Sequence, residues 1–263
     1  MSWLTKTLSS SIGKKVLMSL TGLFLCTFLL VHLIGNLQLF KNDGGYAFNK
    51  YAVFMTTFPL IKVISYVNYA LILFHAFWGL YLEFQNRKAR PIAYAVVRNQ
   101  SSFSSRNMAI LGTILLVYIV VHMGDFWYKF HNEPLPYAKY TENVVSGVVT
   151  TEEMPSTYSQ EVKMVEMSNE AAGTHTVVLK DLYKEVGVSF QNPLLVIFYI
   201  LGMFAVAYHL YHGFQSAFQT LGWNHPKYTP LVKFIGTWVF AIAIPLGFAA
   251  MPIYFYIQHL MGN

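Results

Sequence analysis

Five of the nine histidines stand inside long apolar stretches of the sequence. They are His32, His75, His122, His209 and His212. Ionisable side chains at membrane depth are costly, so residues of this kind are candidates for function. A single buried histidine can serve only to hydrogen-bond a neighbouring helix. Four separate stretches that each carry at least one indicate a shared chemical task instead.

The residues that accompany these histidines favour haem over other metal centres. Zinc and di-iron sites usually add thiolates or carboxylates to the imidazoles. Here the acidic residues in the apolar stretches are Glu83 and Asp125, both near ends, and the single cysteine, Cys26, excludes an intramolecular disulfide and a cysteine cluster. Two neutral imidazoles, in contrast, are a sufficient axial ligand set for a haem between helices. The sequence therefore predicts bis-histidine haem.

The elements that must position these histidines are membrane helices. The chain has 263 residues, of which 55% are hydrophobic and only 11% charged, against about 25% charged in soluble domains. That composition excludes a disordered protein and argues against a nucleic-acid-binding protein, despite the net charge of +6. Since about 20 apolar residues cross a bilayer, we expect an all-α integral membrane protein with five transmembrane helices at 16–40, 61–84, 108–130, 193–218 and 231–257.

The remaining segments divide the chain into four parts. Residues 1–15 resemble an interfacial helix, residues 16–130 hold the first three spans, and residues 191–263 hold the last two. Residues 131–190 form a connection far longer than a bundle linker. Apolar and polar residues alternate at 161–167 and 174–179, so we expect a small folded outer loop that is partly β. Pro245 and Pro252 should bend the fifth helix.

Lysine and arginine predict the orientation. With a cytoplasmic N-terminus, the inner segments hold ten basic residues and one acidic residue, and the rest of the chain holds eight basic and eleven acidic ones. Cytoplasmic loops of membrane proteins carry such an excess. All four arginines, Arg87, Arg90, Arg98 and Arg106, lie in or beside the loop between the second and third spans. We therefore expect the N-terminus inside and the C-terminus outside.

The depth of each histidine predicts how the histidines pair. His32 follows Lys15 by 17 residues and His122 follows Arg106 by 16, which places both roughly 25 Å from the inner edge at the α-helical rise. His75 lies roughly 18 Å from that edge by the same measure. The expected pairs are His32 with His122, and His75 with either His209 or His212 from the inner half of the fourth span.

The order and depth of these histidines resemble a known family. The segments that carry the resemblance are LLVHLIGNL at 29–37, LFHAFWGLY at 73–81, YIVVHMGDFW at 118–127 and AYHLYHGFQSAFQTLG at 207–222. They are similar to the di-haem cytochrome b membrane anchors of succinate:quinone oxidoreductases, in particular the single-anchor, five-helix type that works with menaquinone. The resemblance covers the bundle but not the loop 131–190, which is longer than in better-known relatives.

The resemblance implies a role for individual residues. His75 and His209 would ligate a proximal haem b, because the family's ligand on the fourth helix opens a His-x-x-x-Gly stretch, and His212 would be an alternative ligand or a polar neighbour. His32 and His122 would ligate a distal haem b. Further candidates complete the site: Asp125 for proton transfer beside the quinone, Lys15 and Arg106 for the haem propionates, and Asn36, Gln38 and Trp127 near the quinone.

The resemblance also implies partners and a place in respiration. A flavoprotein subunit would carry out the dicarboxylate chemistry of the tricarboxylic acid cycle, and an iron–sulfur subunit would pass electrons to this anchor. The electrons would cross the proximal and then the distal haem to menaquinone. The setting would be a bacterial inner membrane, with the chain crossing it several times in contact with lipid and binding no nucleic acid.

Four alternatives remain beside this interpretation. The complex could run in reverse as a fumarate reductase. The chain could anchor a hydrogenase or a formate dehydrogenase, which also use intramembrane bis-histidine haems. The histidines could form a proton relay in a transporter or channel, although the sequence has no repeat typical of transporters. The chain could also be a structural anchor without haem.

Overall fold

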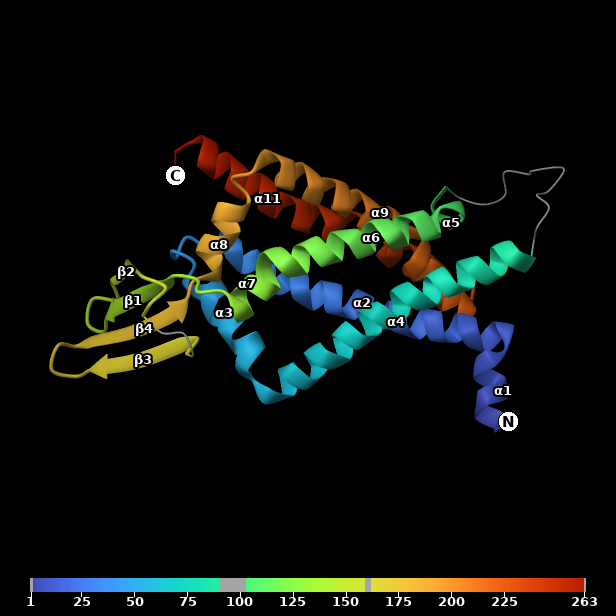
Figure 1. Ribbon diagram of the computed structural model, residues 1–263, viewed down its shortest axis with the longest axis horizontal. Coiled ribbons are helices and arrows are strands. Elements are labelled where there is room, and N and C mark those ends of the chain that lie inside the picture. The colour runs from blue at the N-terminus through green and yellow to red at the C-terminus, as the bar shows by residue number, and fades with distance from the viewer. Residues whose placement is uncertain (1, 90–102, 159–161, 263) are drawn as a thin grey trace. The chain divides into compact units, whose positions relative to one another are not determined.

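The computed structural model describes residues 2–89, 103–158 and 162–262. Arg90, Arg98 and Glu161, which entered the charge and strand predictions above, lie outside the described residues. Helix is the main structure, with 72% of the residues, and one small antiparallel sheet accompanies it (Figure 1).

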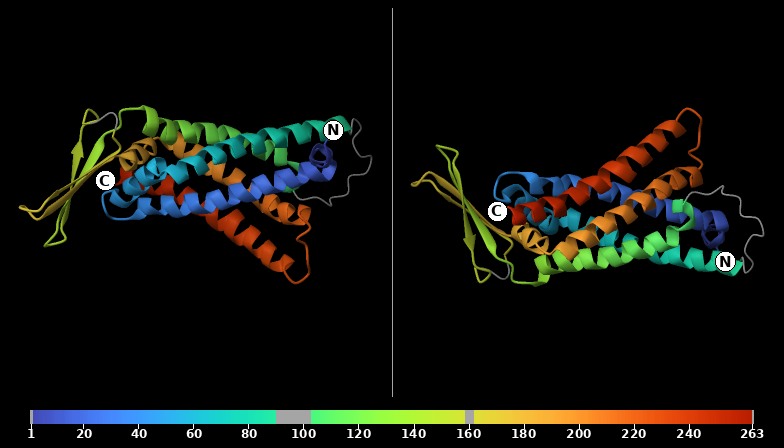
Figure 2. Two further views of the ribbon diagram at one scale, coloured as in Figure 1. Left: turned by 90° about the horizontal axis from the view of Figure 1, so that it is seen from below. Right: turned by 90° about the horizontal axis from the view of Figure 1, so that it is seen from above.

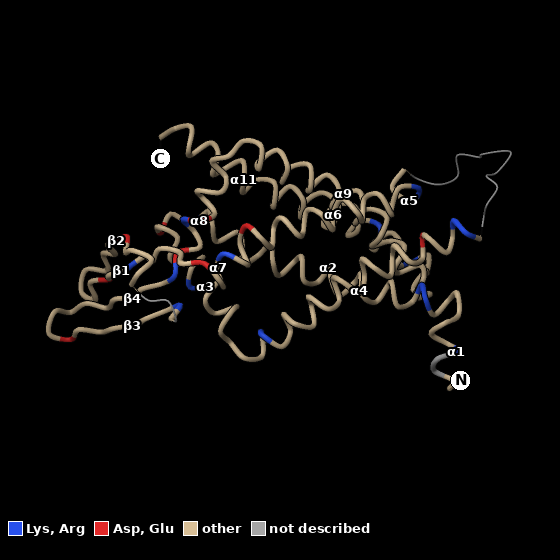
Figure 3. Tube along the Cα trace, viewed as in Figure 1, with Lys and Arg blue, Asp and Glu red and all other residues tan. Residues whose placement is uncertain are grey.

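In the part of the chain that the structure describes, five helices are long and apolar enough to cross a membrane, as predicted. They cover Ser11–Phe40, Pro59–Ala89, Met108–Asn132, Pro193–Thr220 and Thr229–Leu260. Each predicted span lies within one of them. Their middle parts carry no Lys, Arg, Asp or Glu, as the long tan stretches of Figure 3 show. The fold is consistent with a multi-pass membrane protein.

Each span is built from one to three helical elements. The first is α2 (Ser11–Asn36) with the 3₁₀ turn η1 (Leu37–Phe40), the second is α4 (Pro59–Ala89), and the fourth is α9 (Pro193–Thr220). The third joins α6 (Met108–His122), the π-helical η2 (Met123–Tyr128) and α7 (Lys129–Asn132). The fifth joins α10 (Thr229–Phe234), the π-helical η3 (Ile235–Ala243) and α11 (Ile244–Leu260).

Shorter helices lie at the ends of the spans. They are α1 (Trp3–Ser9), α3 (Tyr46–Thr57), α5 (Phe103–Arg106) and α8 (Leu182–Ser189). The side chains of Trp3 and Ile12 are about three-quarters exposed, as a segment at a membrane surface requires. The first span begins at Ser11 rather than at residue 16, because the helix continues through Lys14 and Lys15.

Two π-helical stretches interrupt the regular winding of the spans. One of them, η3, ends two residues before Pro245, and α11 contains Pro252 in its interior. Proline removes an amide donor from a helix, and membrane helices tolerate this when local rewinding satisfies the freed carbonyls. The winding of the fifth span therefore changes just ahead of Pro245, and the predicted bend stays a prediction.

The chain divides into two compact units, which are described separately. Unit 1 comprises Met1–Leu33, Ser65–Tyr118 and Phe198–Ala249, and unit 2 comprises Ile34–Ile64, Ile119–Ile197 and Ala250–Asn263. The core of unit 1 gathers apolar side chains of α2, α9, η3 and α11, namely Cys26, Met203, Val206, Leu210, Phe214, Phe240 and Ile244. This core holds the inner faces of those helices together.

Unit 2 contains the expected β structure. The strands β1 (Tyr137–Asn143), β2 (Val149–Met154), β3 (Met164–Asn169) and β4 (Thr174–Lys180) form an antiparallel sheet in the order β2-β1-β4-β3. Ala138 pairs with Leu179 and Tyr140 with Val177, so these four buried side chains share one face. Figure 2 shows α3 and α8 on the same side of the sheet, and α3 packs Ala52 and Val53 into this core.

A buried polar network fixes α3 to the sheet and to α8. Asn49 is fully buried; its amide donates to Oδ1 of Asp181 (2.8 Å) and to the hydroxyl of Tyr140 (3.1 Å). Its carbonyl oxygen accepts from the backbone N–H of Tyr183 (2.9 Å). Asp181 also caps α8 by accepting from the N–H of Lys184. Burial raises the pKa of Asp181, and these two donated hydrogen bonds oppose that shift.

Candidate functional site

Unit 1 brings two of the predicted ligands, His75 and His209, next to each other. His75 lies on α4 and His209 on α9, and their ring centroids are 6.2 Å apart with an interplanar angle of 69°. A histidine nitrogen lies about 2 Å from a metal ion that it binds, and the ring centroid lies about 1 Å further back. Two imidazoles on opposite sides of one metal ion therefore need about the separation that is found here.

A hydroxyl group on a third helix contacts one ring nitrogen of His75. Oγ1 of Thr21, on α2, lies 2.9 Å from Nδ1 of His75. The same hydroxyl lies 3.0 Å from the carbonyl oxygens of Leu17 and Met18, to which it can donate its one proton. In the tautomer that carries the proton on Nδ1, His75 donates to this oxygen and Nε2 keeps its lone pair, as in metal-binding histidines.

His209 has a different environment. Its Nδ1 is buried and has no hydrogen-bond partner among the described residues. A buried polar atom without a partner is unusual in a folded protein and calls for a bound group or a functional explanation. His212 lies three residues further along α9. Among the described residues, the histidine ring found next to His75 is that of His209. Of the two residues predicted as partners of His75, the structure places His209 beside it.

Glycines on two helices lie against the edges of the paired rings. A Cβ atom at Gly22 of α2 would lie 3.3 Å from Cε1 of His75, and one at Gly112 of α6 would lie 3.9 Å from Cε1 of His209. The first distance is tighter than ordinary contact, so Gly22 permits α2 to approach the ring.

The donor set of this pair suits haem better than a bare metal ion. Among the described residues no three side chains of His, Cys, Asp or Glu gather closely enough to hold a metal ion. Zinc takes four ligands from the protein or three with water, whereas a haem already supplies four nitrogens and needs only two axial ones. The two facing imidazoles and the orphaned Nδ1 therefore fit a haem group.

The predicted distal ligands lie in different units, so each is described alone. His32 of unit 1 stacks on Phe28 with centroids 5.2 Å apart and lies 5.5 Å from the ring of Phe248. His122 of unit 2 ends α6 and packs edge to face against Phe126 at 5.5 Å. Each imidazole contacts at least one aromatic ring. Their pairing stays a prediction.

The residues predicted near the quinone all belong to unit 2. Asp125 and Trp127 lie in the π-helical η2, Asn36 ends α2, and Gln38 lies in η1. Trp127 stacks on His131 at 4.7 Å, and its carbonyl oxygen lies 2.8 Å from Nδ1 of that histidine. Gln38 accepts a hydrogen bond from Lys41. Single turns of π-helix are frequent at functional sites, which keeps Asp125 a candidate.

Of the two residues predicted for propionates, Lys15 lies in the first turns of α2 and Arg106 ends α5. Neighbouring Lys14, which sequence reasoning did not single out, forms the contact with α4. Its ammonium group donates to Gln85 (2.8 Å), and its carbonyl oxygen accepts from the indole N–H of Trp78 (3.2 Å). Lys14 therefore makes the contact between α2 and α4, and Lys15 stays the candidate for binding an anion.

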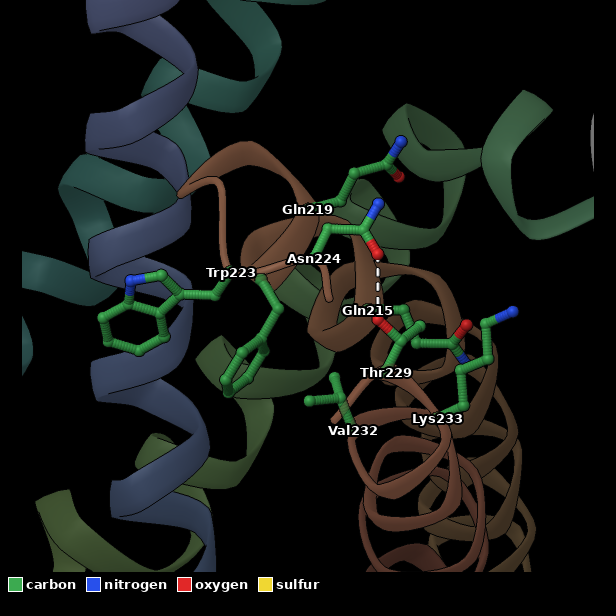
Figure 4. A pocket seen from close by; sticks show the side chains of 8 residues that line it. Gln215, Gln219, Trp223, Asn224, Thr229, Val232 and Lys233 are labelled. Carbon is green, nitrogen blue, oxygen red and sulfur yellow. Dashed lines mark hydrogen bonds between the residues drawn. The ribbon is translucent and has the colours of Figure 1, made fainter. Parts of the chain in front are cut away.

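A separate polar hollow of ≈ 230 Å³ lies at the turn between α9 and α10 (Figure 4). Gln215, Gln219 and Lys233 contribute to its wall, and Thr229 donates to Asn224 across it (2.9 Å). None of the predicted site residues lines it. Its amides and one lysine provide hydrogen bonds but no general base.

Sequence reasoning missed Thr21, whose partner His75 lies 54 residues away. It also missed Asn68 of α4, which is 3% exposed and whose Oδ1 has no hydrogen-bond partner among the described residues. Asn68 precedes His75 by seven residues, or two helical turns, and so shares its face. A lone asparagine in an apolar span is the signal that would have identified it.

Comparison with family models, with curated proteins and with solved structures finds no match to this chain.

Proposed function

We propose that this chain is the cytochrome b membrane anchor of a succinate:menaquinone oxidoreductase and carries two haem b groups. The observation that supports this most is the pair His75 and His209, at 6.2 Å, with Nδ1 of His75 hydrogen-bonded to Thr21. When bound, haem supplies one-electron chemistry between partners that oxidise succinate and a quinone that accepts electrons in the membrane.

The residues around the pair have distinct tasks in this proposal. Thr21 holds His75 in the tautomer that leaves Nε2 as a ligand, and Gly22 lets α2 approach that ring. Apolar side chains around the site exclude water, and burial of this kind tunes the reduction potential of a haem. The N-terminus lies inside the cell, the soluble flavoprotein and iron–sulfur subunits bind at the inner side, and the loop 131–190 lies outside.

Asp125 is the proposed proton carrier beside the quinone. Quinone reduction takes up two protons with two electrons, so the site needs a titratable group at the membrane edge. Asp125 stands in η2, three residues after His122, and an acidic residue within a span marks a proton pathway by default. Asn36, Gln38 and Trp127 are the proposed polar and aromatic wall of this quinone site.

The first experiment is to count haem in the purified chain and record its reduced-minus-oxidised spectrum. We expect two non-covalent b haems per chain, one of which is lost in His75→Ala and in His209→Ala. His212→Ala is the matched control on the same helix and should retain both haems. A fully folded chain with no haem contradicts the proposal and favours the proton relay or the structural anchor.

A second experiment separates the succinate interpretation from its rivals. Native membranes that lack this chain should lose succinate-driven reduction of menaquinone and retain the reduction driven by hydrogen or formate. Loss of either of the latter activities would assign the chain to a hydrogenase or a formate dehydrogenase. Fumarate reduction by reduced menaquinone, assayed in the same membranes, tests the reverse direction.

A further inference from the structure

Unit 2 contains a cavity that none of the proposed haem or quinone residues lines. Its volume is ≈ 440 Å³, and three segments form it: the end of α3 with Val53, Thr56 and Thr57, the first turn of α4 with Lys62, and the chain entering β3 with Lys163. Val162 and Met164 complete the wall. We call this cavity the lysine pocket.

Lys62 and Lys163 line the lysine pocket, and a third lysine, Lys180, lies beside Lys163. The ammonium groups of Lys163 and Lys180 both lie over the ring of Phe130, at 4.9 Å and 5.6 Å from its centroid. Lys180 is buried, and it donates to the carbonyl oxygens of Phe130 and Glu133 at 2.8 Å each. The charges that act on Lys163 are those of Lys180 and Lys62, and both are positive.

Among the described residues, the three lysines take part in none of the five ion pairs that are found. Those ion pairs involve other lysines, an arginine and a histidine. Glu133 acts on Lys180 through its charge, and that lysine is also engaged with two carbonyl oxygens. The segment 131–190 is acidic as a whole, so the cationic pocket that Lys163 shares with Lys62 is a local arrangement that suits an anion.

The surface beside the pocket identifies the kind of anion. Lys62 stands in the first turns of a helix that is apolar enough to cross a membrane. Around it the side chains of Phe58, Leu60 and Val63 are between 44% and 62% exposed. Anionic headgroups are held by basic pockets next to membrane helices, while acyl chains cover the apolar surface below. A free inorganic ion would leave that apolar surface uncovered.

We propose that the lysine pocket binds the phosphate headgroup of an anionic membrane lipid, with Lys62 and Lys163 as its ligands. The hydroxyls of Thr56 and Thr57 donate to backbone carbonyls of α3 and line the pocket as neutral polar wall. Lysine binds phosphate as a compact point charge, so two lysines from separate segments can hold one phosphate between them. The bound lipid would tie the approach to β3 to the first turn of α4.

The test is lipid titration of the full chain in detergent, followed by native mass spectrometry. Phosphatidylglycerol is the probe, phosphatidylcholine is the neutral comparison, and inorganic phosphate is added as a competitor. The double variant Lys62→Gln/Lys163→Gln should bind phosphatidylglycerol about tenfold more weakly than the parent, the size expected for loss of charge-assisted hydrogen bonds. Lys163→Arg should retain binding.

The matched control is Lys50→Gln/Lys139→Gln. It also removes two positive charges from unit 2, but at residues outside the pocket. It should bind phosphatidylglycerol as the parent does. Equal affinity of the test and control double variants would overturn the proposal, as would equal affinity of the parent for the two lipids. Displacement of the lipid by millimolar phosphate, with no preference for the lipid, would assign the pocket to a free anion instead. None of these results depends on haem.

Discussion

Oγ1 of Thr21 lies 2.9 Å from Nδ1 of His75 and joins α2 to α4 at the histidine pair. When the hydroxyl donates to the carbonyl oxygens of its own helix, it accepts from Nδ1 of His75. The contact orients the imidazole and, in that arrangement, leaves Nε2 without a proton. The role of this contact in unit 1 can be tested through its effect on the proposed haem.

Thr21→Val removes the acceptor for Nδ1 of His75 and keeps the shape of the side chain. We expect the proximal haem to be held about tenfold more weakly, because partners that orient a metal-binding histidine contribute about 10- to 100-fold to affinity. Haem content and the midpoint potential of the remaining haem are the measurements. Thr27→Val is the control, since Thr27 is exposed on the same helix and bonds only to the carbonyl of Leu23. Equal effects of the two variants would contradict the assigned role.

Gly22→Ala introduces a methyl group 3.3 Å from Cε1 of His75. Alanine favours helix by about 1 kcal/mol over glycine, so the fold should persist while the ring is displaced. We expect a changed absorption spectrum of the proximal haem and a reduced haem content. Gly112→Ala, whose Cβ would lie at an ordinary 3.9 Å from His209, should leave both unchanged. A normal spectrum in Gly22→Ala would show that the ring has room to move.

Asn49→Leu tests the buried polar network of unit 2. The variant leaves the N–H of Tyr183 without its acceptor and removes one donor from Asp181. We expect unit 2 to be destabilised by about 2–4 kcal/mol, measured as faster amide exchange in β1 and β4. Asn132→Leu removes a single bond at an exposed residue and should change exchange little. Slow exchange in Asn49→Leu would mean that apolar packing alone holds α3 to the sheet.

Lys163 should lose its proton near pH 8. Burial, together with the charges of Lys180 and Lys62, lowers its pKa from 10.5 to about 8. We expect its rate of acylation, followed by mass spectrometry, to reach half its maximum near that pH. Lys62→Gln should raise this midpoint, because it removes one repelling charge. A midpoint that Lys62→Gln leaves unchanged would contradict the proposed cluster of charges.

The same shift predicts how stability depends on pH. Between pH 8 and 10.5 the unfolded chain keeps the proton on Lys163 while the folded chain has released it. Stability of unit 2 therefore rises with pH in this window through this residue. Lys163→Gln should lack that part of the rise when amide exchange of β4, corrected for its intrinsic pH dependence, is compared at pH 8 and pH 10. A rise of the same size in the variant would assign it to other groups.

Most of the secondary structure could be predicted from the sequence. The five spans are visible because hydropathy is a property of each stretch by itself, and β3 and β4 were signalled by the alternation of apolar and polar residues. The helix α3 was missed because it is short, and Asn49 looks polar and exposed when it is in fact fully buried. The change to π-helical winding at η2 and η3 has no simple sequence signal.

For the histidine pair, too, one part was predictable from the sequence and another part was not. Depth along the helices predicted that His75 pairs with His209 or His212, since rise per residue is fixed by the helix itself. Which of the two faces His75 depends on the rotation of α9 about its axis. That rotation is decided by packing, with Leu210 and Phe214 of α9 buried in the core of unit 1.

By itself, the sequence determined five apolar helices, a partly β loop and the residue types available for chemistry. Only the tertiary structure decided that Thr21 meets His75 and that Lys62 and Lys163 line one pocket. The physical reason is the range of the interactions. Helix formation and hydropathy are local, whereas helix rotation and strand register are set by side chains that are distant in the sequence and must fit together.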